Sequence, residues 1–187
     1  MIYRNYFKRD CNYFIIVVFV FILLLIISPD SYLHYLFGRD DSAMYFTAGK
    51  AMMKGMIPYV DFTESKGPFL WLIYGIGYII SHYNYIGIFW LSVISFSVTF
   101  IYLYKLSYLY LNDEKTSLLS TIATSFFIFC VWWHWEVKSE DWCQPFIVIC
   151  LYYSCKMYQL KNIQNDDLKK TFFSFGIAFS VCLLIKY

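Results

Sequence analysis

Charged residues are scarce in this chain. They make up 15% of its 187 residues, whereas hydrophobic residues make up 60%. A soluble domain usually carries about a quarter charged residues. The run Tyr13–Ser28 contains no charge at all and approaches the length of a bilayer span. Because several comparable runs follow, the sequence predicts an all-α, polytopic transmembrane helical protein.

The patterns of metal and disulfide sites are also missing. The six cysteines form no CxxC pair, and no histidines stand near them at metal-ligand spacing. Cys150 and Cys155 lie in an apolar segment, where a thiol behaves as a small hydrophobic group. We therefore expect neither a zinc site nor a disulfide framework. The net charge of +2 is too small to indicate binding of nucleic acid.

One of the apolar runs is too short to cross a bilayer. The segment Phe69–Ser81 has 13 residues, which span about 20 Å as a helix against a hydrocarbon core of about 30 Å. It carries Trp71, Tyr74 and Tyr78, aromatic residues of the kind favoured at the membrane–water interface. We expect this helix to lie at the surface. The expected crossings are then 13–28, 85–111, 117–135, 142–158 and 171–185.

The distribution of basic residues supports about five crossings. With five, the basic N-terminus and the lysine-rich segment 159–170 both face the cytoplasm, as basic loops prefer. The acidic segments 29–68 and 136–141 then face outward together. With six crossings, the lysine-rich segment would move outside.

The first apolar run follows a basic N-terminus, as a signal peptide does, but Ser28-Pro29-Asp30 is a poor cleavage site. We read the run as an uncleaved first helix with a cytoplasmic N-terminus. The chain is then a single transmembrane module over 1–187. Its first extracytoplasmic loop, 29–84, is large and carries surface helices.

This loop begins with two adjacent carboxylates, Asp40 and Asp41. They precede a pattern that predicts a short helix with Asp41 or Ser42 as its N-cap and Gly55 as its stop. The apolar positions at helical spacing are Met44, Ala48, Ala51 and Met52. A helix N-terminus keeps a carboxylate ionised, so Asp41 could accept a proton. The alternative is that Asp41 only caps the helix while Asp40 is solvated.

Two further polar clusters face the same side. In "PYVDFTESKGPF", Lys66 stands just before the short apolar helix, where a mobile cation and unpaired N–H groups suit a lipid phosphate. In "WEVKSEDWCQPF", Glu140 and Asp141 could join Asp41 in binding a divalent cation, or they could bind polar groups of an acceptor. The alternatives are a lysine that reaches the headgroups and ordinary loop charges.

The order of these motifs resembles that of the GT-C membrane glycosyltransferases. The motifs "DDSAMYF", "GMIPYVDFTESKGPF" and "SEDWCQPF" are similar to those of the protein O-mannosyltransferases and the aminoarabinose transferases of lipid A. The similarity runs through nearly the whole chain. Because members of this superfamily have several hundred residues, we expect the chain to be an N-terminal portion of such an enzyme.

The resemblance implies inverting transfer of a sugar from a polyprenyl-phosphate carrier to a glycan, lipid or protein acceptor. The reaction takes place at the outer face of a membrane, here a bacterial inner membrane. The resemblance also assigns roles to residues: Asp41 as catalytic base with Asp40 as the alternative, Lys66 at the carrier phosphate, Glu140 and Asp141 lining the acceptor cavity, and Asp61 and Glu64 as supports. No cofactor is implied with certainty beyond the divalent cation considered above.

Two other functions remain open from the sequence. A transporter or channel fragment would carry ionisable residues within its spans. Lys105 and Lys156 are the only such residues, and both lie near the predicted cytoplasmic ends. A membrane subunit without catalytic activity is the second alternative.

Overall fold

The computed structural model describes residues 2–34, 40–62, 65–131, 137–159 and 165–186. Within these ranges the regular secondary structure is entirely helical, which confirms the predicted all-α class. The helices are α1 (Ile2–Ile27), α2 (Asp40–Met53), α3 (Pro68–Ile80), α4 (Ile86–Leu111), α5 (Glu114–Val131), α6 (Ser139–Gln159) and α7 (Asn165–Lys186).

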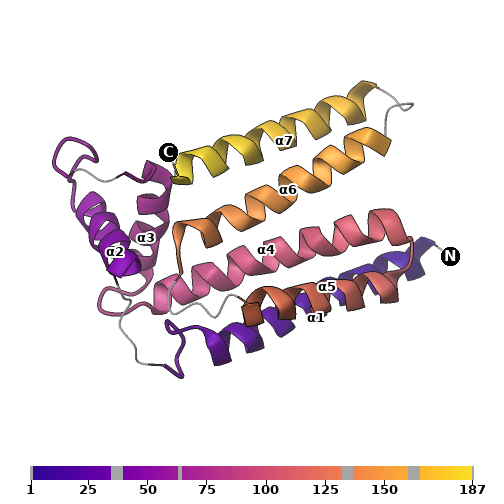
Figure 1. Cartoon of the computed structure of the whole chain (residues 1–187), viewed down its shortest axis with the longest axis horizontal. Helices are drawn as coiled ribbons and strands as arrows, with labels where there is room; N and C mark the ends of the chain where they lie inside the picture. Colours follow the sequence, from indigo (N-terminus) through magenta and orange to yellow (C-terminus); the bar gives the residue numbers. More distant parts are fainter. Residues whose placement is uncertain (1, 35–39, 63–64, 132–136, 160–164, 187) are drawn as a thin grey trace.

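Five of the helices form a bundle, and the other two lie across one of its ends. Helices α1, α4, α5, α6 and α7 run side by side in alternating directions, and α2 and α3 lie across the end opposite the N-terminus (Figure 1). We call the latter the α2–α3 end. The segments that follow α1 and precede α6 both lie there, as does the end of α7. The two acidic segments are therefore at the same end, as the sequence predicted.

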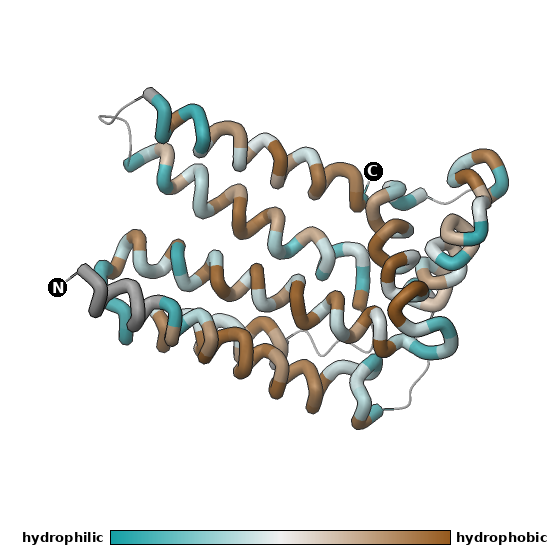
Figure 2. Tube along the Cα trace, turned by 180° about the vertical axis from the view of Figure 1, so that it is seen from behind, coloured by the Kyte–Doolittle hydropathy of each residue, from teal (hydrophilic) through white to brown (hydrophobic). Residues whose placement is uncertain are grey.

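Among the residues that the structure describes, three helices are long and apolar enough to cross a membrane: α1 from Asp10, α4, and α7 from Asp166. Figure 2 shows hydrophobic residues along the bundle helices and hydrophilic ones mostly near the helix ends and turns. Helices α5 and α6 run beside these three but are more polar, so the count of five crossings stays a prediction. The hydroxyl groups of α5 are compatible with lipid because they donate to carbonyls one turn back, as Thr121 does to Ser117 O at 2.8 Å.

Helix α3 has 13 residues, as predicted, and lies across the bundle rather than along it (Figure 1). Its glycines let neighbouring helices approach closely. A Cβ on Gly49 of α2 would stand 2.5 Å from the backbone nitrogen of Gly75. A Cβ on Gly87 of α4 would stand 2.1 Å from the carbonyl oxygen of Gly77. Real Cβ atoms essentially never come so close, so small residues at these positions fix α3 between α2 and α4.

Helix α2 ends as predicted, and its buried face includes the predicted Ala48 but is shifted toward Tyr45. Gly55 has a φ of 92°, and its N–H donates to Met52 O at 3.0 Å, which is typical of a glycine-terminated helix. Met44, expected on the buried face, is 40% exposed, whereas Tyr45 is 1% exposed. The face turns by one residue because the aromatic ring of Tyr45 packs edge-on against Tyr74 of α3, with 5.6 Å between ring centroids.

The core has two parts. One lies between α1, α4 and α5, and its buried members are Ile16, Val20, Leu24, Phe89, Val93, Phe96, Phe100, Tyr104 and Phe129. The other joins α2, α3, α6 and α7 at the α2–α3 end, and its buried members are Tyr45, Leu70, Tyr74, Ile88, Val137, Trp142, Cys143 and Ile185. The second cluster fixes the relative positions of the elements that carry the predicted site residues.

Candidate active site at the α2–α3 end

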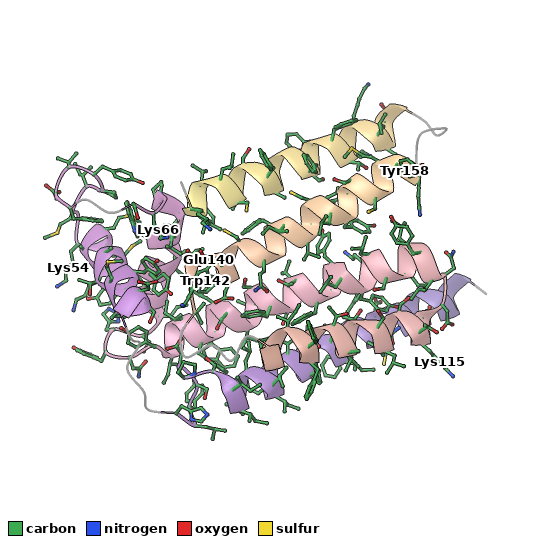
Figure 3. The ribbon with its side chains drawn as sticks, viewed as in Figure 1. Lys54, Lys66, Lys115, Glu140, Trp142 and Tyr158 are labelled. Atoms are coloured by element: carbon green, nitrogen blue, oxygen red, sulfur yellow. The ribbon has the colours of Figure 1, made fainter. Side chains whose placement is uncertain are left out.

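The described site residues all belong to elements at the α2–α3 end. Lys66, Glu140 and Trp142 are labelled there in Figure 3. Asp40 and Asp41 begin α2, and Asp61 lies in the loop between α2 and α3. Glu64 falls outside the described residues.

Helix α2 begins two or three residues earlier than predicted, because Asp40 is already helical. Asp41 therefore lies in the first turn instead of at the N-cap. A carboxylate in this turn still interacts favourably with the positive end of the helix dipole. The Asp41 side chain is half-buried, and the neighbouring Ser42 is buried. Asp41 thus lies next to the predicted position at the start of α2, with a shifted helix boundary.

The loop before Lys66 is held by its own side chains. The Asp61 carboxylate accepts the Ile57 N–H at 2.7 Å, and the Tyr59 hydroxyl donates to the carbonyl of Lys66 at 2.8 Å. The ring of Tyr59 packs on Trp71 of α3 with 4.9 Å between centroids. Asp61 therefore shapes the loop, and Tyr59 fixes the backbone of Lys66.

Lys66 directly precedes the N-cap of α3, as the sequence predicted. The N-cap is Gly67, and Pro68 follows at the first helical position. The Gly67 N–H donates to Ile185 O in α7 at 3.2 Å. A Cβ on Gly67 would stand 2.0 Å from the carbonyl oxygen of Leu184. The backbone next to Lys66 thus rests directly on the last turn of α7, a contact that the sequence did not reveal.

Asp141 is largely occupied in forming the start of α6. It is 2% exposed. One carboxylate oxygen accepts the backbone N–H of Lys138 at 2.9 Å, and the other accepts the side-chain amide of Gln144 at 3.2 Å. A carboxylate at the third helical position that reaches back to the N-cap amide is half of a capping box. Asp141 therefore stabilises the start of α6, which carries the neighbouring Glu140.

Glu140, in contrast, faces the next helix. Its carboxylate lies 3.2 Å from the Lys186 ammonium of α7 and accepts the Ser139 hydroxyl at 3.0 Å. Partial burial raises the pKa of Glu140, but hydrogen bonds from its own backbone, Lys186 and Ser139 outweigh this and leave the pKa below its ordinary value. Glu140 and Lys66 are thus both linked to the last turn of α7.

Two residues that sequence reasoning overlooked complete this region. The Tyr74 hydroxyl donates to Val137 O at 2.8 Å, which joins α3 to the segment before α6. Burial, together with the negative charges of Asp30 and Asp141, raises the pKa of Tyr74 well above its ordinary value. Asp30 is 4% exposed although it directly follows the first span. In the sequence, the only sign that Asp30 belongs to this region is its position next to Pro29, and that pattern is not specific to a functional site.

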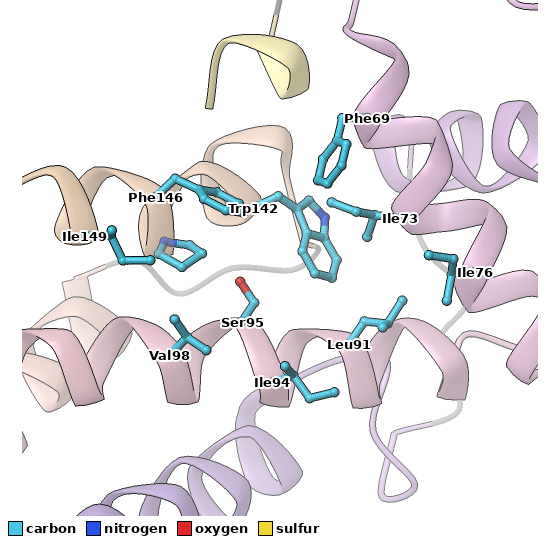
Figure 4. A pocket seen from close by; sticks show the side chains of 11 residues that line it. Phe69, Ile73, Ile76, Leu91, Ile94, Ser95, Val98, Trp142, Phe146 and Ile149 are labelled. Carbon is cyan, nitrogen blue, oxygen red and sulfur yellow. The ribbon is translucent and has the colours of Figure 1, made fainter. Parts of the chain in front are cut away.

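An apolar cavity of about 280 Å³ adjoins these polar residues (Figure 4). It lies between α3, α4 and α6, and its lining includes Phe69, Leu91, Trp142 and Phe146. Phe69 is three residues after Lys66, and Trp142 directly follows Asp141. The cavity therefore extends from the charged end into the apolar bundle.

The described residues hold no cluster of three or more His, Cys, Asp or Glu side chains that could bind a metal ion. The predicted combination of Asp41, Glu140 and Asp141 thus gains no support as a cation site. These three residues come from α2 and α6, and the contacts of Asp141 and Glu140 are directed to protein groups. The connection of α2 to this region runs through the packing of Tyr45 on Tyr74.

The chain matches a known protein family. A family model described as dolichyl-phosphate-mannose-protein mannosyltransferase matches residues 65–187, more than half of the chain. The match includes Lys66, Glu140 and Asp141, whereas Asp40 and Asp41 precede it. Neither the curated proteins nor the solved structures give a match. With its long apolar helices, the chain is an integral membrane protein that belongs to the dolichyl-phosphate-mannose-protein mannosyltransferase family, a family of membrane glycosyltransferases.

Proposed function

We propose that the α2–α3 end is the sugar-transfer site of a membrane glycosyltransferase that uses a polyprenyl-phosphate-linked sugar. The observation that carries the proposal is the position of Lys66. It stands at the start of a helix that lies across the bundle end, next to an apolar cavity and within the family match. A lipid phosphate needs a cation at the membrane surface and an apolar path for its chain, and this arrangement provides both.

The donor would bind with its phosphate at Lys66, beside the start of α3. The Gly67 N–H already donates to Ile185 O and Pro68 has no N–H, so the attraction would come from the lysine ammonium and the positive end of the helix dipole. The isoprenoid chain would enter the cavity beside Phe69 and Trp142. Lys66 would then neutralise the charge that develops on the phosphate as the sugar leaves.

The transfer would be a single displacement that inverts the anomeric carbon. The acceptor oxygen or nitrogen attacks this carbon, and the bond from the carbon to the phosphate oxygen breaks with its electron pair staying on the phosphate. Asp41 takes the acceptor proton, and Asp40 is the alternative base. Glu140 orients the acceptor, while Asp141 holds the start of α6.

The remaining predicted residues have supporting roles in this scheme. Asp61 holds the loop that leads to Lys66 through its bond to the Ile57 amide. We assign Glu64 the same supporting role from the sequence motif alone.

We infer that the α2–α3 end faces outward and that the N-terminus is in the cytoplasm, in a bacterial inner membrane. Helix α1 begins with Arg4, Lys8 and Arg9, and α7 begins near Lys169 and Lys170. Both of these helix starts lie at the end opposite α2 and α3 (Figure 1). Basic residues favour the cytoplasmic side, which supports this orientation.

The central test is Asp41→Asn, compared with Asp40→Asn, in membranes that contain the protein and a polyprenyl-phosphate-linked labelled sugar. Loss of a general base typically lowers the rate about 10²–10⁴-fold. We expect that loss for Asp41→Asn, with unchanged binding of polyprenyl phosphate, and a small effect for Asp40→Asn. Unchanged turnover in Asp41→Asn would remove the assigned role, and the opposite ranking would transfer it to Asp40.

A further inference from the structure

Two cysteines that are far apart in the sequence meet between α6 and α7. The thiol of Cys143 donates to the carbonyl of Cys182 at 3.8 Å, and the two thiols also interact with each other. Cys143 is 4% exposed, and Cys182 is partly buried against it. Because 39 residues separate the two cysteines, their spacing gives no motif, and the sequence did not indicate this pair.

The ion pair at the end of the same two helices holds the backbones close. Glu140 is three residues before Cys143, and Lys186 is four residues after Cys182, so the ion pair of 3.2 Å lies about one turn from the thiols. A disulfide requires Cα atoms within about 7 Å and side chains that point toward each other. The contact of the Cys143 thiol with the carbonyl of Cys182 brings the two backbones close together, and rotation of the Cys182 side chain would then bring the sulfur atoms together.

A third cysteine on α6 also interacts with Cys182 and is the competing partner. Cys150 is seven residues after Cys143, and its thiol lies 3.8 Å from the carbonyl of Phe175. It is therefore directed toward α7 about two turns farther from the ion pair. Cys155 is farther along still and is a matched control on the same helix.

We propose that Cys143 and Cys182 are a redox-sensitive pair that closes into a disulfide between α6 and α7. The oxidant is a small-molecule or protein disulfide. The thiolate of Cys182, the less buried of the two, attacks it and forms a mixed disulfide with release of one thiol. The Cys143 thiolate then attacks the Cys182 sulfur and displaces the other thiol. A bond forms between the two Sγ atoms, two S–H bonds are lost, and the two electrons and two protons convert the oxidant to two thiols.

The bond would hold the last turn of α7 covalently. Ile185, whose carbonyl accepts the Gly67 N–H, is three residues after Cys182. Oxidation would therefore hold the last turn of α7, which contacts Gly67, by a covalent bond. In the reduced protein, the ion pair and apolar packing would hold it. This device does not depend on the proposed transfer reaction, because it requires only the α6–α7 contact.

The test uses the full chain purified in detergent and treated with oxidised glutathione. Remaining thiols are blocked with N-ethylmaleimide, and the unreduced protein is digested and analysed by mass spectrometry. We expect a peptide pair joined through Cys143 and Cys182, lighter by two hydrogens than the separate peptides and separated by dithiothreitol. Cys143→Ser and Cys182→Ser should each abolish it, and Cys155→Ser should retain it.

Three results would overturn the proposal: a disulfide between Cys150 and Cys182, a disulfide between two chains, or glutathione adducts without a cross-link. The alanine variants of Cys143 and Cys182 serve as a second pair if a serine variant fails to fold. Each alanine substitution removes one of the two thiols of the proposed disulfide. A cross-linked peptide that persists in both alanine variants would therefore also refute the proposal.

Discussion

Replacing Gly67 by alanine tests the contact between α3 and α7 most directly. Its φ of −72° and ψ of 154° are open to any residue, so the substitution introduces no backbone strain. The change adds only a methyl group, which would stand 2.0 Å from the carbonyl oxygen of Leu184. The effect of Gly67→Ala therefore measures how closely the two helices approach.

The magnitude follows from that distance. Ordinary contacts with a Cβ begin at 3.4 Å, so α3 and α7 must separate by more than 1 Å. Overpacking of this kind costs about 1–3 kcal/mol. The separation also weakens the bond from the Gly67 N–H to Ile185 O, at about 0.5–1.5 kcal/mol. The sum is about 1.5–4.5 kcal/mol, which lowers the apparent Tm by about 3–18 °C for a chain of this size.

The assay is thermal unfolding of both proteins in the same detergent, with Gly176→Ala as the control. Gly176 lies within α7, and a Cβ there would meet no atom within 4 Å. Alanine in a helix interior is about 1 kcal/mol more favourable than glycine, so the control should be slightly stabilised. In the proposed site, Gly67→Ala should also weaken binding of polyprenyl phosphate, because Lys66 moves with its neighbour.

Equal melting temperatures for the two glycine variants would refute the reasoning. That result would mean that the backbone of Gly67 does not rest on Leu184 and that α7 does not support Lys66. A stability loss with unchanged binding of polyprenyl phosphate would preserve the contact but separate it from the donor site.

Three further substitutions have defined outcomes. Tyr74→Phe leaves the buried carbonyl of Val137 without its hydrogen-bond donor. The substitution should lower the free energy of unfolding, measured thermally or with denaturant, by about 1–3 kcal/mol. A loss of stability no larger than that of Tyr83→Phe, whose ring is exposed, would contradict this. Because the folded-state pKa of Glu140 is lowered, the wild-type protein should be more stable than Glu140→Gln at neutral pH. This stability difference should vanish as the pH falls through that pKa, which lies below the ordinary 4.5. A difference that persists at lower pH would exclude this carboxylate as its source. Ser95→Phe fills the apolar cavity and should reduce polyprenyl phosphate binding, whereas Thr124→Phe on the exposed side of α5 should not; equal binding in both would exclude the cavity as the chain site.

The features that the sequence predicted well depend on length and charge. The 13 residues of α3 are too few to span a bilayer, and this length, together with its aromatic residues, predicted a helix that does not cross the membrane with the others. Alternating basic and acidic segments predicted that both acidic segments lie together. The position of Lys66 before α3 followed from Gly67-Pro68, since proline is favoured at the start of a helix.

The features that the sequence could not provide depend on contacts between distant residues. Asp141 carries the same charge as Glu140 beside it, but only the folded chain shows that Asp141 binds the Lys138 amide while Glu140 pairs with Lys186. The buried face of α2 was misplaced by one residue because Tyr45 packs on Tyr74 of α3, which helical periodicity cannot anticipate.

The contact of Gly67 with α7 has a practical consequence for labelling this protein. A probe inserted directly after Lys186 would begin two residues from Ile185, whose carbonyl accepts the Gly67 N–H. A probe placed ahead of α1 would lie at the opposite end of the bundle (Figure 1). Fluorophores and affinity tags therefore disturb the loop of Lys66 least when they precede α1.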